Sequence, residues 1–254
     1  MEISLSKIFT TITLFCLTFM VIEFLYSIKK RDGVYSKSGT LGNFLDYLVT
    51  RIISDLSSKI FLATTITVAS VYLKNNYNND FNLLIFITCL LIIDFEFYLL
   101  HFLKHKINFL WMFHHVHHSD NKFNTSTFLR ASWVEQALIM SLPIIPPMLI
   151  GINPETILLS SFFGFIFQFF VHSQYIKFPH FMSYIFITPQ LHKIHHDQVN
   201  KNQNSNFGAI FSMWDRMFGT YVDKIDNFTP GIKGYHQENI LKIYTDPIIN
   251  NYKK

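Results

Sequence analysis

Long apolar runs are the feature of this sequence that most restricts its fold. A membrane-spanning helix needs about 20 mostly apolar residues, and the segments that approach or reach this length are residues 8–28, 58–73, 81–102, 137–152 and 157–171. Backbone polar groups find no water inside a bilayer, so single segments cross it as helices. Only 15% of the residues are charged, against about 25% in an average soluble protein. The sequence therefore predicts an all-α integral membrane protein, which we treat as one domain over residues 1–254.

The last two apolar segments are short and interrupted. Pro143, Pro146 and Pro147 break the fourth segment, and a Gly-Ile-Asn-Pro turn at residues 151–154 joins it to the fifth. They form either two spans or a hairpin that enters and leaves on one side, because broken helices are tolerated where protein buries them. We therefore expect four to five transmembrane or re-entrant helices. A cleavable signal peptide is the alternative interpretation of residues 8–28, but this run is too long and lacks a small-residue cleavage site.

The basic residues predict the orientation in the membrane. Lys and Arg gather after the first, third and fifth segments, whereas residues 74–80 contain one lysine and the turn at 151–154 contains none. The positive-inside rule then makes the basic regions cytoplasmic. They form no continuous basic stripe, so we expect no nucleic-acid partner. The Asn-, Ile- and Lys-rich composition and the lack of a retrieval ending favour a bacterial inner membrane over the endoplasmic reticulum.

Histidines are clustered at regular spacings. His101 and His105 lie four residues apart near the end of the third segment. Two later clusters repeat an i, i+3, i+4 pattern, which places side chains on one face of a helix. With the predicted topology, these clusters and the histidine that ends the fifth segment reach the same membrane face.

Such a constellation is typical of a catalytic metal site. Imidazole binds iron, zinc, copper and nickel, and the number of clustered histidines exceeds what one ion accepts. Two ions with four or five nitrogens each would retain an open position, as catalytic sites do. The predicted ligands are His101, His105, His114, His117, His118, His172, His192, His195 and His196. His115 lies off the shared helix face, and His180 and His236 are isolated, so we interpret these three as structural or surface residues.

Several motifs in order resemble the fatty acid hydroxylase and sterol desaturase superfamily, over about residues 85–225. They are Asp94-x6-His101-x3-His105, Leu110-Trp111-x2-His114-x2-His117-His118-Ser119, Phe170-Val171-His172-Ser173, Thr188-Pro189-x2-His192-x2-His195-His196, Asn206-Phe207-Gly208 and Trp214-Asp215-Arg216-x-Phe218-Gly219-Thr220-Tyr221. Some fatty acid hydroxylases have a further histidine four residues after the equivalent of His172. Ile176 stands there, which argues against the sphingolipid-hydroxylase branch.

The resemblance implies membrane helices under a cytosolic helical cap that carries a histidine-bound di-iron centre. It also implies O2-dependent hydroxylation or desaturation of a membrane lipid, whether a fatty acyl, sterol-like or ether lipid. Electrons would come from a separate donor resembling cytochrome b5, ferredoxin or a reductase.

Metal-bound histidines usually donate their second ring N–H to a carboxylate or carbonyl. Asp94 lies two helical turns before His101 on the same face, and ionisable groups in apolar segments are commonly functional. Asn206, Asp215 and Asp197 are further candidates for supporting the ligands. Asp215 would alternatively pair with Arg216.

Other interpretations remain open at this level. A membrane zinc hydrolase would use a metal-bound hydroxide. A metal transporter or sensor would hold ions at mid-membrane depth, whereas these histidines lie at helix ends. Arg130 and Glu135 flank the fourth segment, and we interpret them as interface anchors.

Overall fold

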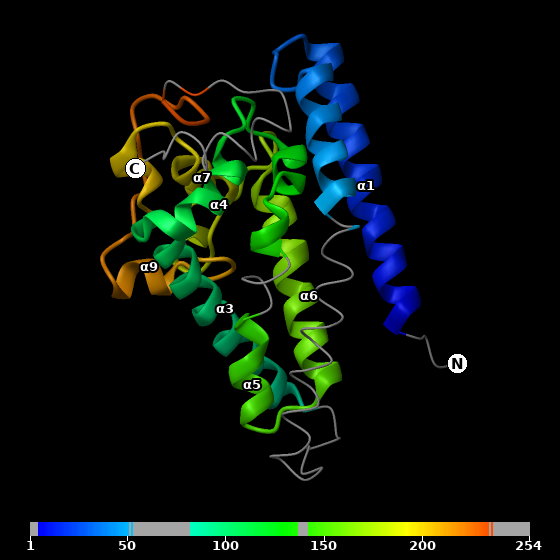
Figure 1. The fold of residues 1–254 in the computed structure, drawn as a ribbon, viewed down its shortest axis with the longest axis vertical. Coiled ribbons are helices and arrows are strands. Elements are labelled where there is room, and N and C mark those ends of the chain that lie inside the picture. Colours follow the sequence, from blue (N-terminus) through cyan, green and yellow to red (C-terminus); the bar gives the residue numbers. More distant parts are fainter. Residues whose placement is uncertain (1–4, 51, 53–81, 137–141, 234, 236–254) are drawn as a thin grey trace.

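The computed structural model describes residues 5–50, 52, 82–136, 142–233 and 235. Within them the regular structure is helical, and only isolated β-bridges occur. The predicted segment at 58–73 lies outside the described residues. Besides a helix over residues 37–50, the elements are α1 (Leu5–Lys30), α3 (Leu83–Lys106), α4 (Asn108–His118), η1 (Thr125–Leu129), η3 (Leu142–Ile144), α5 (Ile145–Leu149), α6 (Pro154–Val171), η4 (His180–Tyr184), α7 (Pro189–His195), α8 (Asn200–Gln203) and α9 (Met213–Met217) (Figure 1).

Three of these helices are long and apolar enough to cross a membrane: Thr10–Lys30 within α1, α3 and α6. Local signals set where α3 and α6 begin. The Asn82 side chain accepts hydrogen bonds from the backbone N–H groups of Leu84 and Ile85, and Asn153 caps α6 ahead of a proline in its first turn, the arrangement that favours helix initiation. The all-α membrane class predicted from the apolar runs is confirmed.

The fourth apolar segment forms no long helix where the structure describes it. Its prolines divide residues 142–149 into η3 and α5, which span only three and five residues, because a proline inside a helix removes one hydrogen bond and clashes with the preceding turn. The neighbouring residues 137–141 lie outside the described part. Both short helices pack against α3, and α5 also contacts α6. Residues 142–149 therefore reach the start of α6 without forming a long helix of their own.

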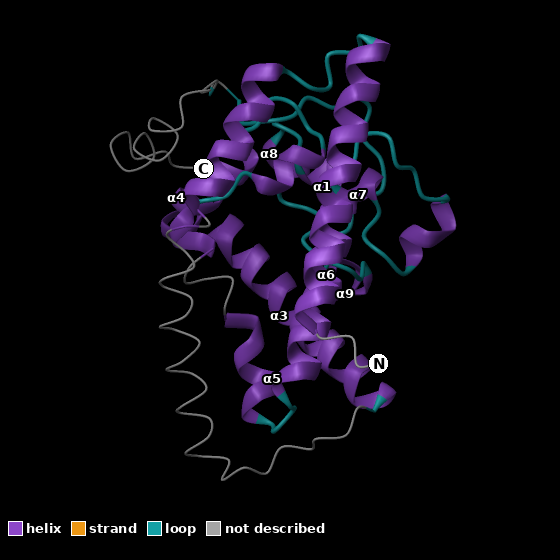
Figure 2. Cartoon of the chain, turned by 90° about the vertical axis from the view of Figure 1, so that its right-hand side faces the viewer, coloured by secondary structure: helices purple, strands orange, loops and turns teal. Residues whose placement is uncertain are grey.

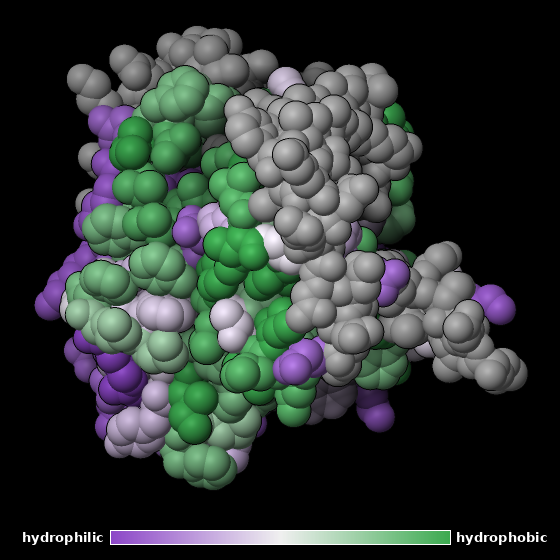
Figure 3. Space-filling view, turned by 90° about the horizontal axis from the view of Figure 1, so that it is seen from below, coloured by the Kyte–Doolittle hydropathy of each residue, from purple (hydrophilic) through white to green (hydrophobic). Residues whose placement is uncertain are grey.

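The spans pack with their C-terminal ends at one end of the molecule. Cys89 and Ile93 of α3 pack on Met148 and Ile157 near α5. Figures 1 and 2 both show α5 at the opposite end of α3 and α6 from α4 and α7. Seen from the α5 end, much of the described surface is hydrophobic (Figure 3). The histidine-bearing helices therefore form a cap at one end of an apolar bundle.

A buried polar network fastens α1 to this cap. The Glu23 carboxylate accepts hydrogen bonds from the hydroxyls of Tyr35 at 2.5 Å, Thr125 at 2.6 Å and Ser173 at 2.5 Å. Glu23 is buried although it belongs to an apolar helix. Since Ser173 directly follows His172, this carboxylate fixes the chain beside a predicted ligand.

Candidate metal centre

The histidines predicted as ligands converge into two groups, within each of which one ring nitrogen per residue lies within 4.8 Å of all the others. The first group is His101, His105, His114, His118 and His195, and the second is His117, His172, His192 and His196. All are buried except His117, which is half-buried. The structure thus brings all nine together.

The remaining histidines lie apart from these groups or outside the described chain. His115 is buried, but its Nδ1 lies 2.9 Å from the carbonyl of Met112 and it belongs to neither group. His180 is exposed, and His236 lies outside the described residues. His115 and His180 therefore lie outside both groups.

Each i, i+3, i+4 box is divided between the two groups. His114 and His118 of α4 join the first group, while His117 between them joins the second. The box at α7 does the reverse, because His192 and His196 join the second group and His195 the first. The ring planes of His118 and His196 stack with centroids 4.5 Å apart. The two groups therefore adjoin, and each box links them.

Five ring nitrogens are fixed by acceptors. The distance from Nδ1 to a backbone carbonyl oxygen is 2.6–3.0 Å in four pairs: His101 with Phe207, His117 with Arg130, His172 with Gln168, and His195 with Ser205. The fifth Nδ1, that of His114, lies 2.9 Å from a carboxylate oxygen of Glu135. Such oxygens only accept hydrogen bonds, so each Nδ1 carries the hydrogen and each Nε2 presents a lone pair.

With these tautomers, Nε2 lone pairs in the second group face each other, and a bound cation would satisfy them. The Nε2 atoms of His117 and His172 lie 3.2 Å apart, and both present lone pairs. The Nε2 of His192 lies 3.0 Å from that of His172 and 3.2 Å from that of His196. These separations match neighbouring ligands of one ion whose metal–nitrogen bonds are about 2.0–2.1 Å long.

The first group has the same requirement. The Nε2 atoms of His101 and His114 and both ring nitrogens of His118 are buried without a hydrogen-bond partner. A buried polar atom without a partner costs about 1–3 kcal/mol. The donor set therefore fits one metal ion in each group.

Burial keeps these ligands neutral. It lowers the pKa of His118, His192 and His196 well below the ordinary value, and neighbouring histidines lower it further. Burial likewise lowers the pKa of His114 to about 3, although Glu135 opposes this. Neutral imidazole is the form that binds a metal.

Glu135 is the supporting residue that the sequence interpretation missed. Its Oε1 lies 2.9 Å from Nδ1 of His114 and 2.6 Å from Nζ of Lys104, and all three residues are buried. Burial raises the pKa of Glu135, but His114 and Lys104 lower it more, so the carboxylate is ionised. The interpretation of Glu135 as an interface anchor was wrong. The signal in the sequence was an acidic residue next to an apolar segment.

Arg130 also lies inside the cap. Its Nε donates to the Ser119 hydroxyl at 2.9 Å and to the Val116 carbonyl at 3.1 Å, and its own carbonyl accepts from His117. Its interpretation as an interface anchor was therefore wrong as well. Arg130 joins α4 to the segment that follows η1.

Residues 205–208 form a bracket that orients two ligands. The carbonyls of Ser205 and Phe207, on either side of Asn206, accept from His195 and His101. Asn206 has a φ of 54°, a left-handed conformation that asparagine tolerates better than most residues. Its Nδ2 donates to the carbonyls of Leu191 and Val222 at 3.0 and 2.8 Å.

Asp215 completes the bracket. Its carboxylate accepts from the backbone N–H groups of Phe207 at 2.8 Å and Gly208 at 2.9 Å and from the Thr220 hydroxyl at 2.6 Å. Arg216 instead donates to the carbonyl of Ser183. Asn206 and Asp215 thus act on the ligands through the backbone.

Asp94 does not orient His101 directly, contrary to expectation. Its oxygens accept from the backbone N–H groups of Ile210 at 2.7 Å and Phe211 at 3.2 Å and from Nε1 of Trp214 at 2.8 Å. Seven residues of helix separate Asp94 from His101 by about 10 Å along the axis, too far for contact. Asp94 instead ties α3 to the segment that follows the bracket.

Asp197 also supports the cap at a distance from the ring nitrogens. It accepts from the side-chain amide of Asn202 at 2.7 Å and the backbone N–H of Thr229 at 2.9 Å. These bonds hold the chain after the α7 box.

An apolar helix bundle that ends in two adjoining groups of buried histidines defines a histidine-box membrane protein. The chain belongs to the fatty acid hydroxylase family, whose model matches residues 86–220. No solved structure matches it.

Named relatives share this region. The chain is 31% identical over 140 residues to alkylglycerol monooxygenase of Xenopus tropicalis, covering 55% of this chain and 31% of the relative. It is 29% identical over 136 residues to ornithine lipid hydroxylase OlsE of Rhizobium tropici, covering 52% and 40%. It is 30% identical over 141 residues to a cholesterol 25-hydroxylase-like protein of Danio rerio, covering 52% and 53%. This chain spans less than half of the length of the alkylglycerol monooxygenases that it matches.

Proposed function

We propose that the protein is an O2-dependent di-iron oxygenase that hydroxylates or desaturates a membrane lipid. The observation that carries the proposal is the second histidine group, in which neutral rings present facing Nε2 lone pairs 3.2 Å apart. Its four histidines would hold one iron and the first group's five the other. The names of the relatives support a lipid substrate, since they describe hydroxylation or mono-oxygenation of alkylglycerol, ornithine lipid and cholesterol.

The two irons, when bound, would supply the O2 activation needed to attack an unactivated C–H bond. In hydroxylation, two electrons and two protons accompany O2, one oxygen atom enters the C–H bond and the other leaves as water. Desaturation also consumes two electrons and two protons: two hydrogens leave the substrate, and both oxygen atoms become water. A separate redox protein of cytochrome b5, ferredoxin or reductase type would provide the electrons.

The protein's own residues would orient the ligands and exclude water. The bracket at 205–208 fixes the rings of His101 and His195, and Glu135 fixes that of His114. Metal-bound imidazole is neutral, so a bound metal pair would keep its full positive charge.

The position of the site along the spans supports a target carbon near the lipid headgroup. His101 and His105 lie 18 and 22 residues after the first residue of α3, which is about 27–33 Å along a helix. A hydrocarbon core is about 30 Å thick, so these histidines lie close to one of its boundaries. The basic residues at this end support a cytoplasmic location.

Comparative lipidomics under 18O2 tests the proposal. Cells that express the wild type should gain either a lipid carrying one labelled oxygen or a lipid lighter by two hydrogens, and cells that express His117→Ala should not. His180→Ala, an exposed histidine outside both groups, is the matched control and should behave like the wild type. An unchanged lipid profile would overturn the proposal, and product formed without O2 and reductant would favour a zinc hydrolase.

A further inference from the structure

We propose that part of the cap is inserted into the lipid leaflet on the histidine side of the membrane. The inserted part is residues 181–185, which belong to η4 and its C-cap, together with α9 and Phe218; we call it the ledge. Its partner would be the hydrocarbon of the bilayer, with acyl chains against Phe181, Ile185, Met217 and Phe218.

The ledge exposes several large hydrophobic and aromatic side chains. Phe181 is 70% exposed and Met217 67%, and Tyr184, Ile185 and Phe218 are each more than half exposed. The two elements form one surface, because the Ser212 backbone N–H donates to the carbonyl of Ile185 at 2.9 Å. Contiguous apolar patches of this kind mark membrane or protein contacts.

Ring contacts fix the depth of the ledge against α3. Phe218 lies 6.2 Å from Phe95 and 5.5 Å from Tyr98 between ring centroids, and Trp214 lies 4.9 Å from Phe95. Phe95 and Tyr98 are 12 and 15 residues into α3, or about 18–22 Å along it. A hydrocarbon core of about 30 Å that begins at Leu83 includes this depth. Figure 1 shows α9 beside the middle of α3, below α4 and α7.

α6 gives the same depth independently. Phe186, which follows the η4 part of the ledge, lies 5.9 Å from Phe167 between ring centroids. Phe167 is 13 residues into α6, or about 20 Å along it. Two different spans therefore place the ledge deeper in the bilayer than His101, His105 and His172, which lie near the ends of these helices.

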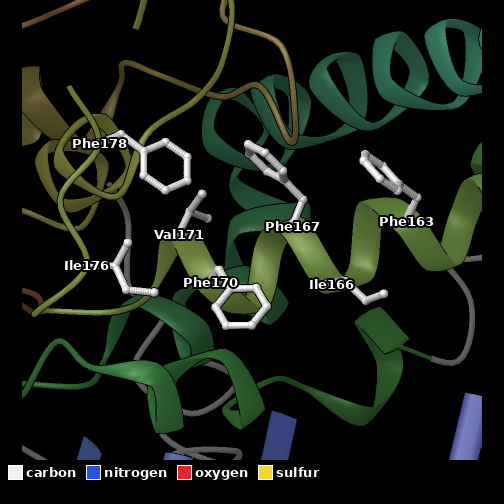
Figure 4. Close-up of a pocket in the computed structure, with 7 residues that line it drawn as sticks. All are labelled: Phe163, Ile166, Phe167, Phe170, Val171, Ile176 and Phe178. Atoms are coloured by element: carbon white, nitrogen blue, oxygen red, sulfur yellow. The ribbon is translucent and has the colours of Figure 1, made fainter. Parts of the chain in front are cut away.

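The surface of α6 continues the apolar character of the ledge. A groove of about 280 Å³ opens on this helix, and in Figure 4 its seven lining side chains are all hydrocarbon. It runs from Phe163 past Phe167 and Phe170 to Phe178. Phe163 to Phe170 lie about 14–24 Å along α6, a range that includes the depth of the ledge. The groove fits an acyl chain that lies along the helix.

The two charged side chains of the ledge, Asp215 and Arg216, both have partners within the protein. The guanidinium carbon of Arg216 lies 3.7 Å from the ring centroid of Tyr221 and 5.0 Å from that of Tyr184, and its Nη2 donates to the carbonyl of Ser183 at 3.2 Å. An arginine near lipid needs such partners because an unpaired charge there is costly. The ledge is thus compatible with insertion despite Arg216.

Insertion would let a substrate remain in the leaflet while it approaches the metal site. That consequence rests on the proposed function, whereas the insertion itself does not.

Depth-dependent quenching tests the insertion. Met217→Cys and Phe181→Cys would each be labelled with a small environment-sensitive fluorophore in the full-length protein in lipid nanodiscs. Cys16 and Cys89 are buried, and each can be replaced by Ser so that only the introduced thiol reacts. Asp226→Cys, at an exposed cap position outside the ledge, is the matched control.

Spin labels on the acyl chains should quench fluorophores at 217 and 181 more strongly than headgroup spin labels, with the reverse order at 226. A membrane-impermeant maleimide should react with the thiol introduced at position 217 more slowly in nanodiscs than in detergent solution, with little such change at 226. Quenching profiles and labelling rates at 217 and 181 that match those at 226 would overturn the proposal. Neither measurement requires turnover, so the insertion proposal can fail or succeed independently of the proposed oxygenase function.

Discussion

The Oε1 atom of Glu135 lies 2.9 Å from Nδ1 of His114, a residue 21 positions earlier in the chain. The same oxygen lies 2.6 Å from Nζ of Lys104. One buried carboxylate oxygen therefore orients a proposed ligand and pairs with an ammonium. Loss of such a supporting partner typically costs about 10–100-fold in metal affinity or activity.

Glu135→Gln should show this loss as weaker metal retention. We expect metal affinity to fall by about 10–100-fold, measured by competition with a chelator. Stability should also fall, by about 3–5 kcal/mol, because Lys104 is left as an unpaired buried charge. The double variant Lys104→Met, Glu135→Gln should recover stability but not metal affinity. Recovery of both would mean that Glu135 serves only to pair the charge.

His117→Ala should empty the second histidine group. The ring of His117 is half-buried and its Nε2 faces that of His172. Metal content measured by mass spectrometry should fall from about two ions per chain to about one or none, because the remaining rings cannot complete that ion's ligand set. His180→Ala should retain the full content. Equal metal content in both variants would contradict the ligand assignment.

Gly208→Ala should distort the bracket. A Cβ at Gly208 would collide with the carbonyl oxygen of Phe211 and would lie 3.0 Å from Cγ1 of Ile187, so the backbone must shift. We expect a loss of about 1–3 kcal/mol from overpacking, together with weaker metal binding as the Phe207 carbonyl moves from His101. Gly42→Ala meets nothing within 4 Å and should leave both unchanged or raise stability slightly. The two variants would be compared by their unfolding in detergent, which reports stability, and by their metal retention.

Asp215→Asn should change how stability depends on pH. Burial raises the pKa of Asp215 to about 6, although three hydrogen bonds lower it. The unfolded value is about 3.9, so between these values the folded protein holds a proton that the unfolded chain has lost. This contribution is fully present below about pH 4 and is lost as the pH rises through about 6. The wild-type advantage over Asp215→Asn should therefore shrink by about 2–3 kcal/mol between about pH 4 and pH 6.

The measurement is denaturant unfolding of both variants after removal of metal, so that protonation of the histidines affects both equally. A constant difference between the variants across this range would show that Asp215 titrates alike in the folded and unfolded chains.

Much of the site could be predicted from residue spacing because helix periodicity is local. The i, i+4 spacing of His101 and His105 and the two later boxes can be recognised without knowledge of the fold. Asp94 shows the limit of the same reasoning. Periodicity placed it on the same helix face as His101, but the rise of about 1.5 Å per residue separates the two by two turns. The segment at 210–214, distant in sequence, decides what Asp94 binds.

Hydropathy and the 3.6-residue period were enough to predict the helical membrane class and the set of clustered histidines. Three features could not be predicted in this way: each box divides between the two groups, Glu135 rather than Asp94 contacts a ligand, and Glu23 in α1 anchors the cap beside His172. These features depend on contacts between residues far apart in the chain, and such contacts are fixed by packing and by the requirement that every buried charge find a partner.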